Sequence, residues 1–487
     1  MSATRSRQPN ILLVVADQMT PFLLEACGHA GARTRHLAAL RDRGVTFSAA
    51  YTASPICVPA RAGLMTGQQV SRLGCYDNGD PFPSYVPTFA HYLSNAGYDV
   101  VLSGKMHFIG ADQLHGFRRR LTTDVYPAGF IWSYPLPAEG APNVFDYVRQ
   151  YQAPNIGAGW SIELQYDEET HFRAVEYLRH APRDRPFSLT VSYTNPHPPY
   201  RVPQAYWELY RDADVPLPRY PEDLDARYSD FDRALMRWHG LDRRSIRDPE
   251  HLRAMRRGFA ALSHYIDDKL GELLAVLEER DFAADTVVLF TSDHGDMLGE
   301  KGLIQKRSFY EWSSRIPFFI ACPGGVPARV DTPVSLLDLA PTILALAGIE
   351  PVCALDGRSL LPALEGRPLE ARPVIAEYHG EGIMRPCVMV RQGDWKYIYV
   401  HNARPQLYHL ASDPGEWINR TGDPAAREVE RALHDVVVGG RFDLDRIEAE
   451  AWARLPQKQV VNQAMARNAT SWDYRVEVDP ATQYVRA

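Results

Sequence analysis

Two pairs of polar residues in this chain each follow an apolar segment that predicts a buried strand. Asp17 and Gln18 come directly after the run Ile11–Ala16, and Asp293 and His294 come just after Thr286–Thr291. In a parallel α/β sheet, ligands gather at the carboxyl ends of the strands. Two carboxylates, an amide oxygen and an imidazole at that edge would suit a hard divalent cation. Taken separately, each pair has a simpler interpretation, in which Asp17 caps a loop and Asp293 begins a turn.

A cysteine near the start of an expected short helix is the second chemical feature. Cys57 opens the pattern Cys-X-Pro-X-Arg, and Arg61 stands one helical turn further along. A helix N-terminus and a nearby guanidinium both stabilise a thiolate, so these residues predict a reactive cysteine. The alternative is that Cys57 is a small buried hydrophobic residue, as most free cysteines are.

The elements that must position these residues alternate between strands and helices. The expected strands are Ile11–Ala16, Val45–Tyr51, Tyr98–Ser103, Phe187–Tyr193 and Thr286–Thr291, and the expected helices are Thr34–Arg43, Pro87–Asn95 and His251–Arg280. This alternation predicts an α/β fold, with a large mostly parallel sheet sandwiched by helices. Two long segments without periodicity, Arg118–Gly159 and Val202–Pro249, are typical of lids or substrate loops.

The pattern changes after about Pro368. Short strands separated by turns, then one amphipathic helix, predict a small antiparallel α+β subdomain with an aromatic tail from Leu455. The expected elements are the strands Val374–Tyr378, Cys387–Arg391 and Trp395–Val400 and the helix Ala426–Val437. We therefore divide the chain into a catalytic domain, 1–370, and a C-terminal subdomain, 371–487.

Composition excludes several classes of protein. The 487 residues carry a formal charge of −7, which gives no reason to expect nucleic acid as a partner. The 6 cysteines are scattered, as in a reduced cytosolic protein. Asp17 interrupts the first apolar run too early for a secretory signal, and no run approaches the ~20 apolar residues of a membrane span. We expect a soluble cytoplasmic protein.

The segment Ser54–Gly67 resembles the signature of the type I sulfatases, formylglycine-dependent enzymes of the alkaline phosphatase superfamily. Further strings match that family in order along nearly the whole chain. They are GKMH (104–107), NPHPPY (195–200), SDHGDMLGEKGLIQK (292–306) and, near the C-terminus, QLYHL (406–410) followed by DPGE (413–416). The resemblance implies an alkaline phosphatase-like fold and hydrolysis of a sulfate ester.

The resemblance also implies roles for single residues. In the family the cysteine is oxidised by a formylglycine-generating enzyme, here a transient partner, and the hydrated aldehyde attacks sulfur. A divalent metal, with Ca²⁺ preferred and Mg²⁺ or Mn²⁺ as alternatives, would be held by Asp17, Gln18, Asp293, His294 and the converted Cys57. Sulfate binding and proton transfer would fall to Arg61, Lys105, His107, His197 and Lys306, with His197 and Lys306 protonating the leaving alcohol. Asn78 is expected to hold a sulfate oxygen.

Within the family the chain resembles the choline sulfatases, through the segments 102–107, 112–117, 121–127 and 292–300 and the tail Ser471–Tyr474. A quaternary ammonium is recognised by aromatic faces and a carboxylate. The predicted set is Trp132, Glu381, Trp472 and Asp473. Asn195 and Pro198 depart from the His and Asp of that group. The likeness of the tail implies a homo-oligomer.

Three other functions stay open at this point. The first is an aryl sulfatase or phosphonate monoester hydrolase that uses the same nucleophile, because the same charges suit sulfuryl and phosphoryl groups. The second is a non-catalytic homologue in which Cys57 stays a thiol. The third is a thiol hydrolase that pairs Cys57 with His107 or His197.

Overall fold

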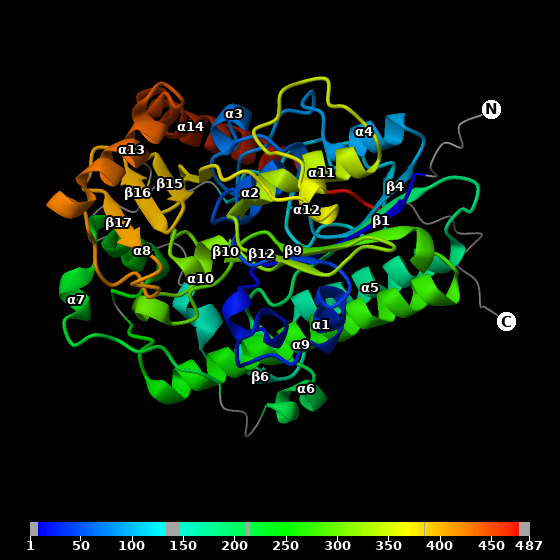
Figure 1. Cartoon of the computed structure of the whole chain (residues 1–487), viewed down its shortest axis with the longest axis horizontal. Coiled ribbons are helices and arrows are strands. Elements are labelled where there is room, and N and C mark those ends of the chain that lie inside the picture. The colour runs from blue at the N-terminus through cyan, green and yellow to red at the C-terminus, as the bar shows by residue number, and fades with distance from the viewer. Residues whose placement is uncertain are drawn as a thin grey trace.

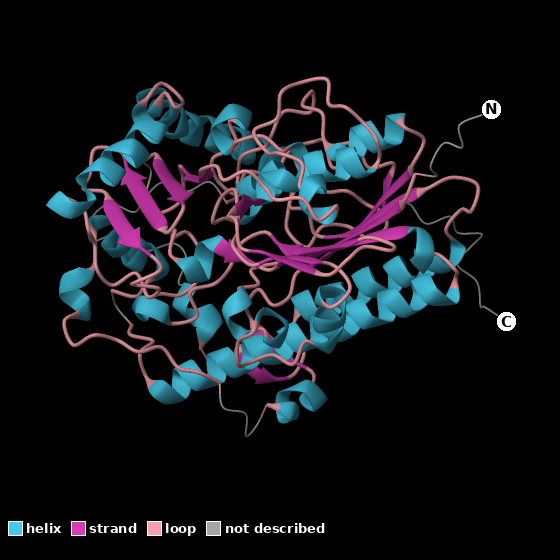
Figure 2. Ribbon diagram, viewed as in Figure 1, coloured by secondary structure: helices cyan, strands magenta, loops and turns pink. Residues whose placement is uncertain are grey.

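A large twisted sheet runs through the middle of the protein, and helices cover both of its faces (Figures 1 and 2). The computed structural model describes residues 8–132, 147–152, 154–210, 215–242, 244–383 and 385–476. In that part of the chain the sheet has 8 strands in the order β12-β2-β11-β9-β1-β7-β4-β5. Their bounds are β12 Ala328–Val330, β2 Val45–Phe47, β11 Phe318–Ala321, β9 Thr286–Ser292, β1 Asn10–Ala16, β7 Phe187–Tyr193, β4 Asp99–Gly104 and β5 Arg119–Arg120.

The register of the central strands decides where the site forms. The strands from β9 through β1, β7 and β4 to β5 are parallel, whereas β11 is antiparallel to both of its neighbours. Ala16 of β1 lies opposite Ser292 of β9 and Tyr193 of β7. Because these parallel strands end level with one another, Asp17 and Asp293 leave the sheet at the same edge. The predicted mostly parallel α/β sheet is confirmed.

The two faces of β1 belong to two different hydrophobic cores, as the two-residue period of a strand requires. Leu12 and Val14 pack with the helices below the sheet in Figure 1, whereas Ile11 and Leu13 pack with those above it. The lower helices are α1 (Arg35–Arg41), α5 (Ile162–His180) and α9 (Pro249–Glu279), and the upper ones are α2 (Cys57–Thr66), α4 (Phe89–Asn95) and α11 (Leu339–Leu346).

The predicted C-terminal antiparallel sheet is also confirmed. It consists of β14 (Val374–Tyr378), β15 (Cys387–Gln392), β16 (Trp395–Val400) and β17 (Gln406–His409), and α13 (Arg427–Val438) packs on it. The tail expected from Leu455 is wrong in its first part, because a helix, α14 (Leu444–Asn468), continues through Pro456. This helix buries Leu444, Ile447 and Ala451 in the C-terminal core. The division at residue 370 stays a prediction.

Two further expectations are corrected. The strand expected at 45–51 is broken into β2 and β3 (Ala50–Tyr51), which join different sheets. Between the two strands, the Ser48 carbonyl accepts from Arg315 Nε at 2.8 Å. In its described residues the segment 202–249 contains the short helices α6 (Gln204–Leu209), α7 (Leu224–Arg227) and α8 (Asp230–His239). Part of the segment 118–159 lies outside the described residues. The remaining strands and α-helices are β6 Ile156–Ala158, β8 Tyr200–Val202, β10 Arg315–Ile316, β13 Val334–Ser335, α3 Val70–Leu73, α10 Glu311–Ser314 and α12 Leu361–Leu364.

No helix in the described ranges combines the length and the apolar character that a bilayer span requires.

Candidate active site

The residues predicted to bind a metal meet at the carboxyl edge of the central sheet. Asp17, Cys57, Asp293 and His294 each offer one ligand atom, and these four atoms all lie within 4.8 Å of one another. All four residues are buried. Chain segments separated by more than 230 residues therefore form one polar cluster in a water-poor environment.

The amide of Gln18 joins this cluster in a fixed orientation. Its backbone N–H donates to Asp293 Oδ1 at 3.0 Å, and its side-chain Nε2 donates to the Tyr151 hydroxyl at 3.1 Å. The opposite end of the amide, Oε1, accepts from Lys306 Nζ at 2.6 Å. These contacts fix which end of the amide is the oxygen and turn that oxygen toward Lys306, the lysine that also contacts Cys57 Sγ.

Cys57 stands at the first position of α2, 2% exposed, with its sulfur facing the cluster. Sγ lies 3.1 Å from Lys306 Nζ, 3.3 Å from His294 Nε2 and 3.9 Å from Lys105 Nζ. Burial and Asp17 oppose ionisation of the thiol, but the neighbouring Lys105 and Lys306 hold the pKa of Cys57 well below its ordinary value. These polar contacts are not those of a small buried hydrophobic residue.

Arg61 contacts both carboxylates of the cluster. Its Nη2 contacts Asp17 and its Nε contacts Asp293, both at 2.9 Å, and its Nη1 donates to the Lys105 carbonyl and to Ser192. Burial opposes the charge on Arg61, but the carboxylates raise its pKa. The sulfate-binding role of Arg61 stays a prediction. Its contacts here are those of a residue that positions the carboxylates.

The donor set fits a hard divalent cation. Burial alone would raise the pKa of Asp17, but Lys105 and Arg61 hold it well below its ordinary value, so the group is a carboxylate. Asp17 Oδ1 is buried and has no hydrogen-bond partner among the described residues, which leaves it free to bind an ion. His294 Nδ1 lies 3.1 Å from the Gly295 carbonyl, so Nδ1 carries the proton and Nε2 presents a lone pair. Cys57 Sγ stands where an oxygen of a converted side chain would complete the set.

His107 and His197 lie beside this cluster, linked by an aromatic ring. The ring of Tyr126 lies 4.9 Å from that of His107 and 6.2 Å from that of His197, measured between centroids. Burial lowers the pKa of both imidazoles, most strongly at His197, where Lys306 adds to the effect. His197 Nδ1 lies 2.7 Å from the Pro198 carbonyl, which fixes the proton on that nitrogen. Both rings are neutral near pH 7.

Asp124, to which no sequence motif gave a role, holds His107 in place. His107 has a left-handed backbone, with φ of 57°. Asp124 Oδ2 accepts from the backbone N–H of His107 at 2.8 Å and of Met106 at 3.0 Å, and it contacts Arg120 at 2.9 Å. Burial opposes its charge, but Arg120, His107 and these N–H groups lower the pKa of Asp124 to about 2.

Replacing Asp124 with asparagine is expected to destabilise the protein in a pH-dependent way. An acid whose pKa is about 2 when folded and roughly 4 when unfolded stabilises the fold above pH ~4, and this contribution is lost as the pH falls toward 2. Asp124→Asn should therefore lower the free energy of unfolding by on the order of 2 kcal/mol at pH 7 and by less at pH 3. Denaturant titrations of both proteins at the two pH values measure the difference, and equal losses would contradict the assignment.

The aromatic residues predicted for the alcohol site occupy two places. Trp132 is half-buried and packs edge-on against Tyr126, with centroids 5.4 Å apart, and against His107. Trp472 packs edge-on against Phe130, with the ring centroids 5.4 Å apart. Asp473 accepts from the backbone N–H of residue 128 at 2.8 Å. The segment 471–474 therefore braces the loop 126–132, and only Trp132 among the predicted aromatics contacts a catalytic candidate.

Glu381 and Asn78 meet near the first turn of α2. Asn78 Oδ1 accepts from the backbone N–H of Val58 at 3.0 Å and so caps the first turn of α2. The backbone N–H of Asn78 donates to Glu381 Oε1 at 3.3 Å. Glu381 is 3% exposed and forms an ion pair with Arg307, whose Nε lies 2.8 Å from Oε2. No sequence motif indicated a role for Arg307.

The comparison with known protein families decides the identity of this site. A family model described as Sulfatase matches residues 9–349, more than half of the chain. The chain belongs to the sulfatase family. A second model, the C-terminal part of N-sulphoglucosamine sulphohydrolase, matches residues 299–441 of this sulfatase. The resemblance found in the motifs is thus confirmed, and the chain is a sulfuric ester hydrolase.

Individual relatives differ in their substrates. The sulfatase is 37% identical to the choline-sulfatase of Rhizobium meliloti (strain 1021), over 98% of this chain and 96% of that one. It is 31% identical to the multifunctional alkaline phosphatase superfamily protein PehA of Trinickia caryophylli, over 85% and 92%. Among solved structures, the phosphonate monoester hydrolase of Agrobacterium radiobacter matches with a TM-score of 0.73 and 23% identity, over 91% and 96%. The last likeness concerns the fold.

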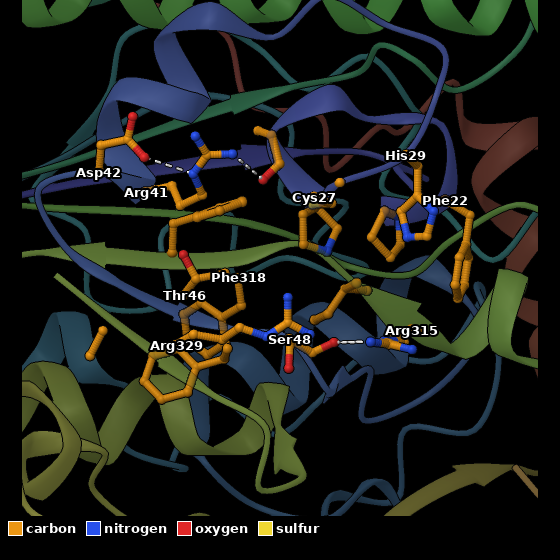
Figure 3. Close-up of a pocket in the computed structure, with 18 of the residues that line it drawn as sticks. Phe22, Cys27, His29, Arg41, Asp42, Thr46, Ser48, Arg315, Phe318 and Arg329 are labelled. Atoms are coloured by element: carbon orange, nitrogen blue, oxygen red, sulfur yellow. Dashed lines mark hydrogen bonds and ion pairs between the residues drawn. The ribbon is translucent and has the colours of Figure 1, made fainter. Parts of the chain in front are cut away.

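A separate cavity of about 700 Å³ lies between the segment 21–29, α1 and the strands β2, β11 and β12 (Figure 3). None of the predicted site residues lines it. Its charged side chains already have partners, since Arg41 pairs with Asp42 at 2.8 Å and Arg315 donates to the Ser48 carbonyl. The cavity does not contribute to the site at the sheet edge.

Proposed function

We propose that the sulfatase hydrolyses a small sulfate ester with a formylglycine formed from Cys57 and a divalent cation, preferably Ca²⁺. The observation that carries this proposal is the contact of Cys57 Sγ with Lys306 and His294 inside the buried cluster of Asp17 and Asp293. When present, the cation would be held by Asp17, Gln18, Asp293 and His294, and it would polarise the nucleophile and a sulfate oxygen. A hydrated formylglycine supplies one hydroxyl for attack on sulfur and a second for the release of sulfate.

The side chains around Cys57 would bind the sulfate group by charge. Lys105 and Lys306 both lie within 4 Å of Sγ and are buried, so each neutralises an anion more strongly than it would in water. Asn78, which caps the first turn of α2 beside the nucleophile, adds a polar group at the same point. This arrangement stabilises the negative charge that spreads over the non-bridging oxygens during transfer.

The two histidines would divide the proton transfers. His107 is neutral and buried beside Cys57, so it is suited to accept the proton of the second hydroxyl. His197 is neutral in the free protein, but an anionic sulfate ester beside it favours the imidazolium form. Its Nε2 then becomes a donor, and with Lys306 it would protonate the leaving oxygen. An alkoxide leaves poorly without that proton.

The alcohol part of the ester would lie against Tyr126 and Trp132. The choline-O-sulfate predicted from the sequence draws support from the Rhizobium meliloti relative and from these two ring faces. The same faces suit an aryl group, so an aryl sulfate or a phosphonate monoester is the second candidate. The formylglycine-generating enzyme as a transient partner, the homo-oligomer and the cytoplasmic location stay predictions.

The experiment that tests this function compares leaving groups. Protein produced together with a formylglycine-generating enzyme should release inorganic sulfate from both p-nitrophenyl sulfate and butyl sulfate. In His197→Asn, kcat for butyl sulfate should fall by roughly 10²-fold or more, whereas p-nitrophenyl sulfate, which needs no proton donor, should lose far less.

Ion chromatography of the released sulfate measures both reactions. Equal losses on the two esters would contradict proton donation by His197. Faster release of alcohol from a phenyl phosphonate monoester than from either sulfate ester would favour the second candidate.

A further inference from the structure

One face of helix α14 contacts two loops of the candidate active site. Residues spaced four apart lie on the same face of an α-helix. On α14 such a row of polar residues consists of Glu450, Arg454, Lys458 and Asn462. Its first three members contact the loop 74–80, and the last contacts the loop 126–132. These loops carry Asn78, proposed for the sulfate group, and Trp132, proposed for the alcohol.

Lys458 neutralises two buried carboxylates of the loop 74–80. Its Nζ lies 2.5 Å from Asp80 Oδ1 and 3.3 Å from Asp77 Oδ1, and all three side chains are buried. Burial and Asp80 raise the pKa of Asp77 to about 7, although Lys458 opposes that shift. Without the ammonium group the two buried carboxylates would repel each other, and the loop would have to rearrange or take up a proton.

The same two carboxylates fix the backbone on either side of Asn78. Asp77 Oδ1 accepts from the backbone N–H of Gly79 at 2.7 Å, and Asp80 Oδ2 accepts from that of Asp77 at 3.2 Å. Asn78 lies between the two aspartates and caps the first turn of α2, which the nucleophile begins. The position of Asn78 beside the nucleophile therefore depends on Lys458.

Asn462, one turn further along α14, holds the loop 126–132. Its Oδ1 accepts from the backbone N–H of Phe130 at 3.1 Å. Because this loop belongs to no helix or strand of the described structure, its N–H groups depend on side-chain acceptors of this kind. The loop carries Tyr126 and Trp132, whose rings pack together with their centroids 5.4 Å apart. Asn462 therefore helps to place the rings that line the proposed alcohol site.

We propose that α14 positions the two parts of the substrate site separately, with Lys458 setting the sulfate side through Asn78 and Asn462 setting the alcohol side through the loop 126–132. The inference rests on the proposed function, because both parts belong to the ester of that reaction. Both residues act through a loop, so they are positioning residues. Because they hold different loops, the loss of one contact should weaken one part of substrate binding and spare the other.

Two constants separate these roles. The first is KM for p-nitrophenyl sulfate, which fills both sides of the site, and the second is Ki for inorganic sulfate, which fills only the sulfate side. Both are measured on protein produced together with a formylglycine-generating enzyme. Neither constant depends on the concentration of active sites, so incomplete formylglycine formation and partial misfolding do not affect them.

Asn462→Ala should raise KM for p-nitrophenyl sulfate at least about fivefold, the factor that the loss of one hydrogen bond typically costs. Ki for inorganic sulfate should stay within roughly twofold of the wild-type value. Asn462→Asp keeps the acceptor oxygen and should bring KM back close to that of the wild type. The matched control is Gln463→Ala, a change at an exposed neighbour on the same helix, which should alter neither constant.

Lys458→Met should raise Ki for inorganic sulfate at least about fivefold and KM by a similar factor, since the ester also carries a sulfate group. The double variant Lys458→Met with Asp77→Asn removes one charge of each sign and still lacks the contact that orders the loop. It should show the same rise of Ki, and it carries the test if the single variant does not fold.

An unchanged KM in Asn462→Ala, equal rises of its KM and Ki, or an unchanged Ki in both Lys458 variants would overturn the inference. A KM in Asn462→Asp as high as that in Asn462→Ala would do the same. The proposed function fails in a different way, through the absence of sulfate release from p-nitrophenyl sulfate by protein shown to contain formylglycine.

Discussion

Replacing Cys57 with alanine is expected to lower kcat/KM for p-nitrophenyl sulfate by on the order of 10⁴-fold or more, since removal of a nucleophile leaves only binding and electrostatic catalysis. The side chain lies within 4 Å of both lysines and of His294, at the centre of the groups that would bind the sulfate. Initial rates with a chromogenic ester measure the loss.

A matched experiment separates this mechanism from thiol catalysis. Mass analysis of the peptide that spans Cys57 should show the aldehyde form in active protein, and the activity of a preparation should scale with its fraction. The thiol form should be inactive and alkylation of thiols should leave activity in place. Full activity in protein that contains only unmodified cysteine would contradict the proposal and favour a thiol hydrolase.

Removal of the divalent cation is expected to have the second largest effect. Dialysis against a chelator should reduce kcat by at least about 10²-fold, because Lys105 and Lys306 alone would then polarise the nucleophile and the sulfate oxygens. Re-addition of Ca²⁺, Mg²⁺ or Mn²⁺ should restore it, Ca²⁺ most fully. Asp17→Asn should lower both the metal content after dialysis and the rate.

The control for Asp17→Asn lies in the second candidate cluster, His36, Asp267 and Asp268. Both carboxylate oxygens of Asp267 already accept backbone N–H groups at the start of α1, so that cluster is a helix cap. Asp268→Asn should leave metal content and rate unchanged. A wild-type protein that keeps its full rate without any bound metal would refute a metal-dependent mechanism.

The central sheet was predictable because its strands are continuous apolar runs that end in polar residues. Such runs are typical of strands buried on both faces, and their polar ends mark the functional edge. Helix α14 was missed because its few buried residues are spread along a segment in which charged, polar and apolar residues alternate without a clear period and which contains Pro456. Its position is set by tertiary contacts, among them Arg454 and Lys458, which contact the loop 74–80.

The site residues that lie in recognisable sequence motifs could be predicted. Contacts between loops that are distant in the sequence could not. The cluster around Cys57 follows from strings that resemble the family, and the structure brings their residues together. The Arg307–Glu381 pair joins loops 74 residues apart, and no periodicity or spacing indicates which loops will pack together. The role of Asp124 could not be predicted for a similar reason. Asp124 accepts hydrogen bonds from two backbone N–H groups, and these contacts are visible only in the three-dimensional structure.

The burial of Cys57 constrains the order of events during biosynthesis. Its sulfur is enclosed by groups near residues 105, 294 and 306. An enzyme that oxidises this thiol must therefore reach it before those later segments have folded around it. The ribosome makes roughly 5–20 residues per second, so the 249 residues between Cys57 and Lys306 give a window on the order of ten seconds to a minute. Slower translation of that stretch would raise the yield of active protein, and refolding of an unconverted chain would not recover it.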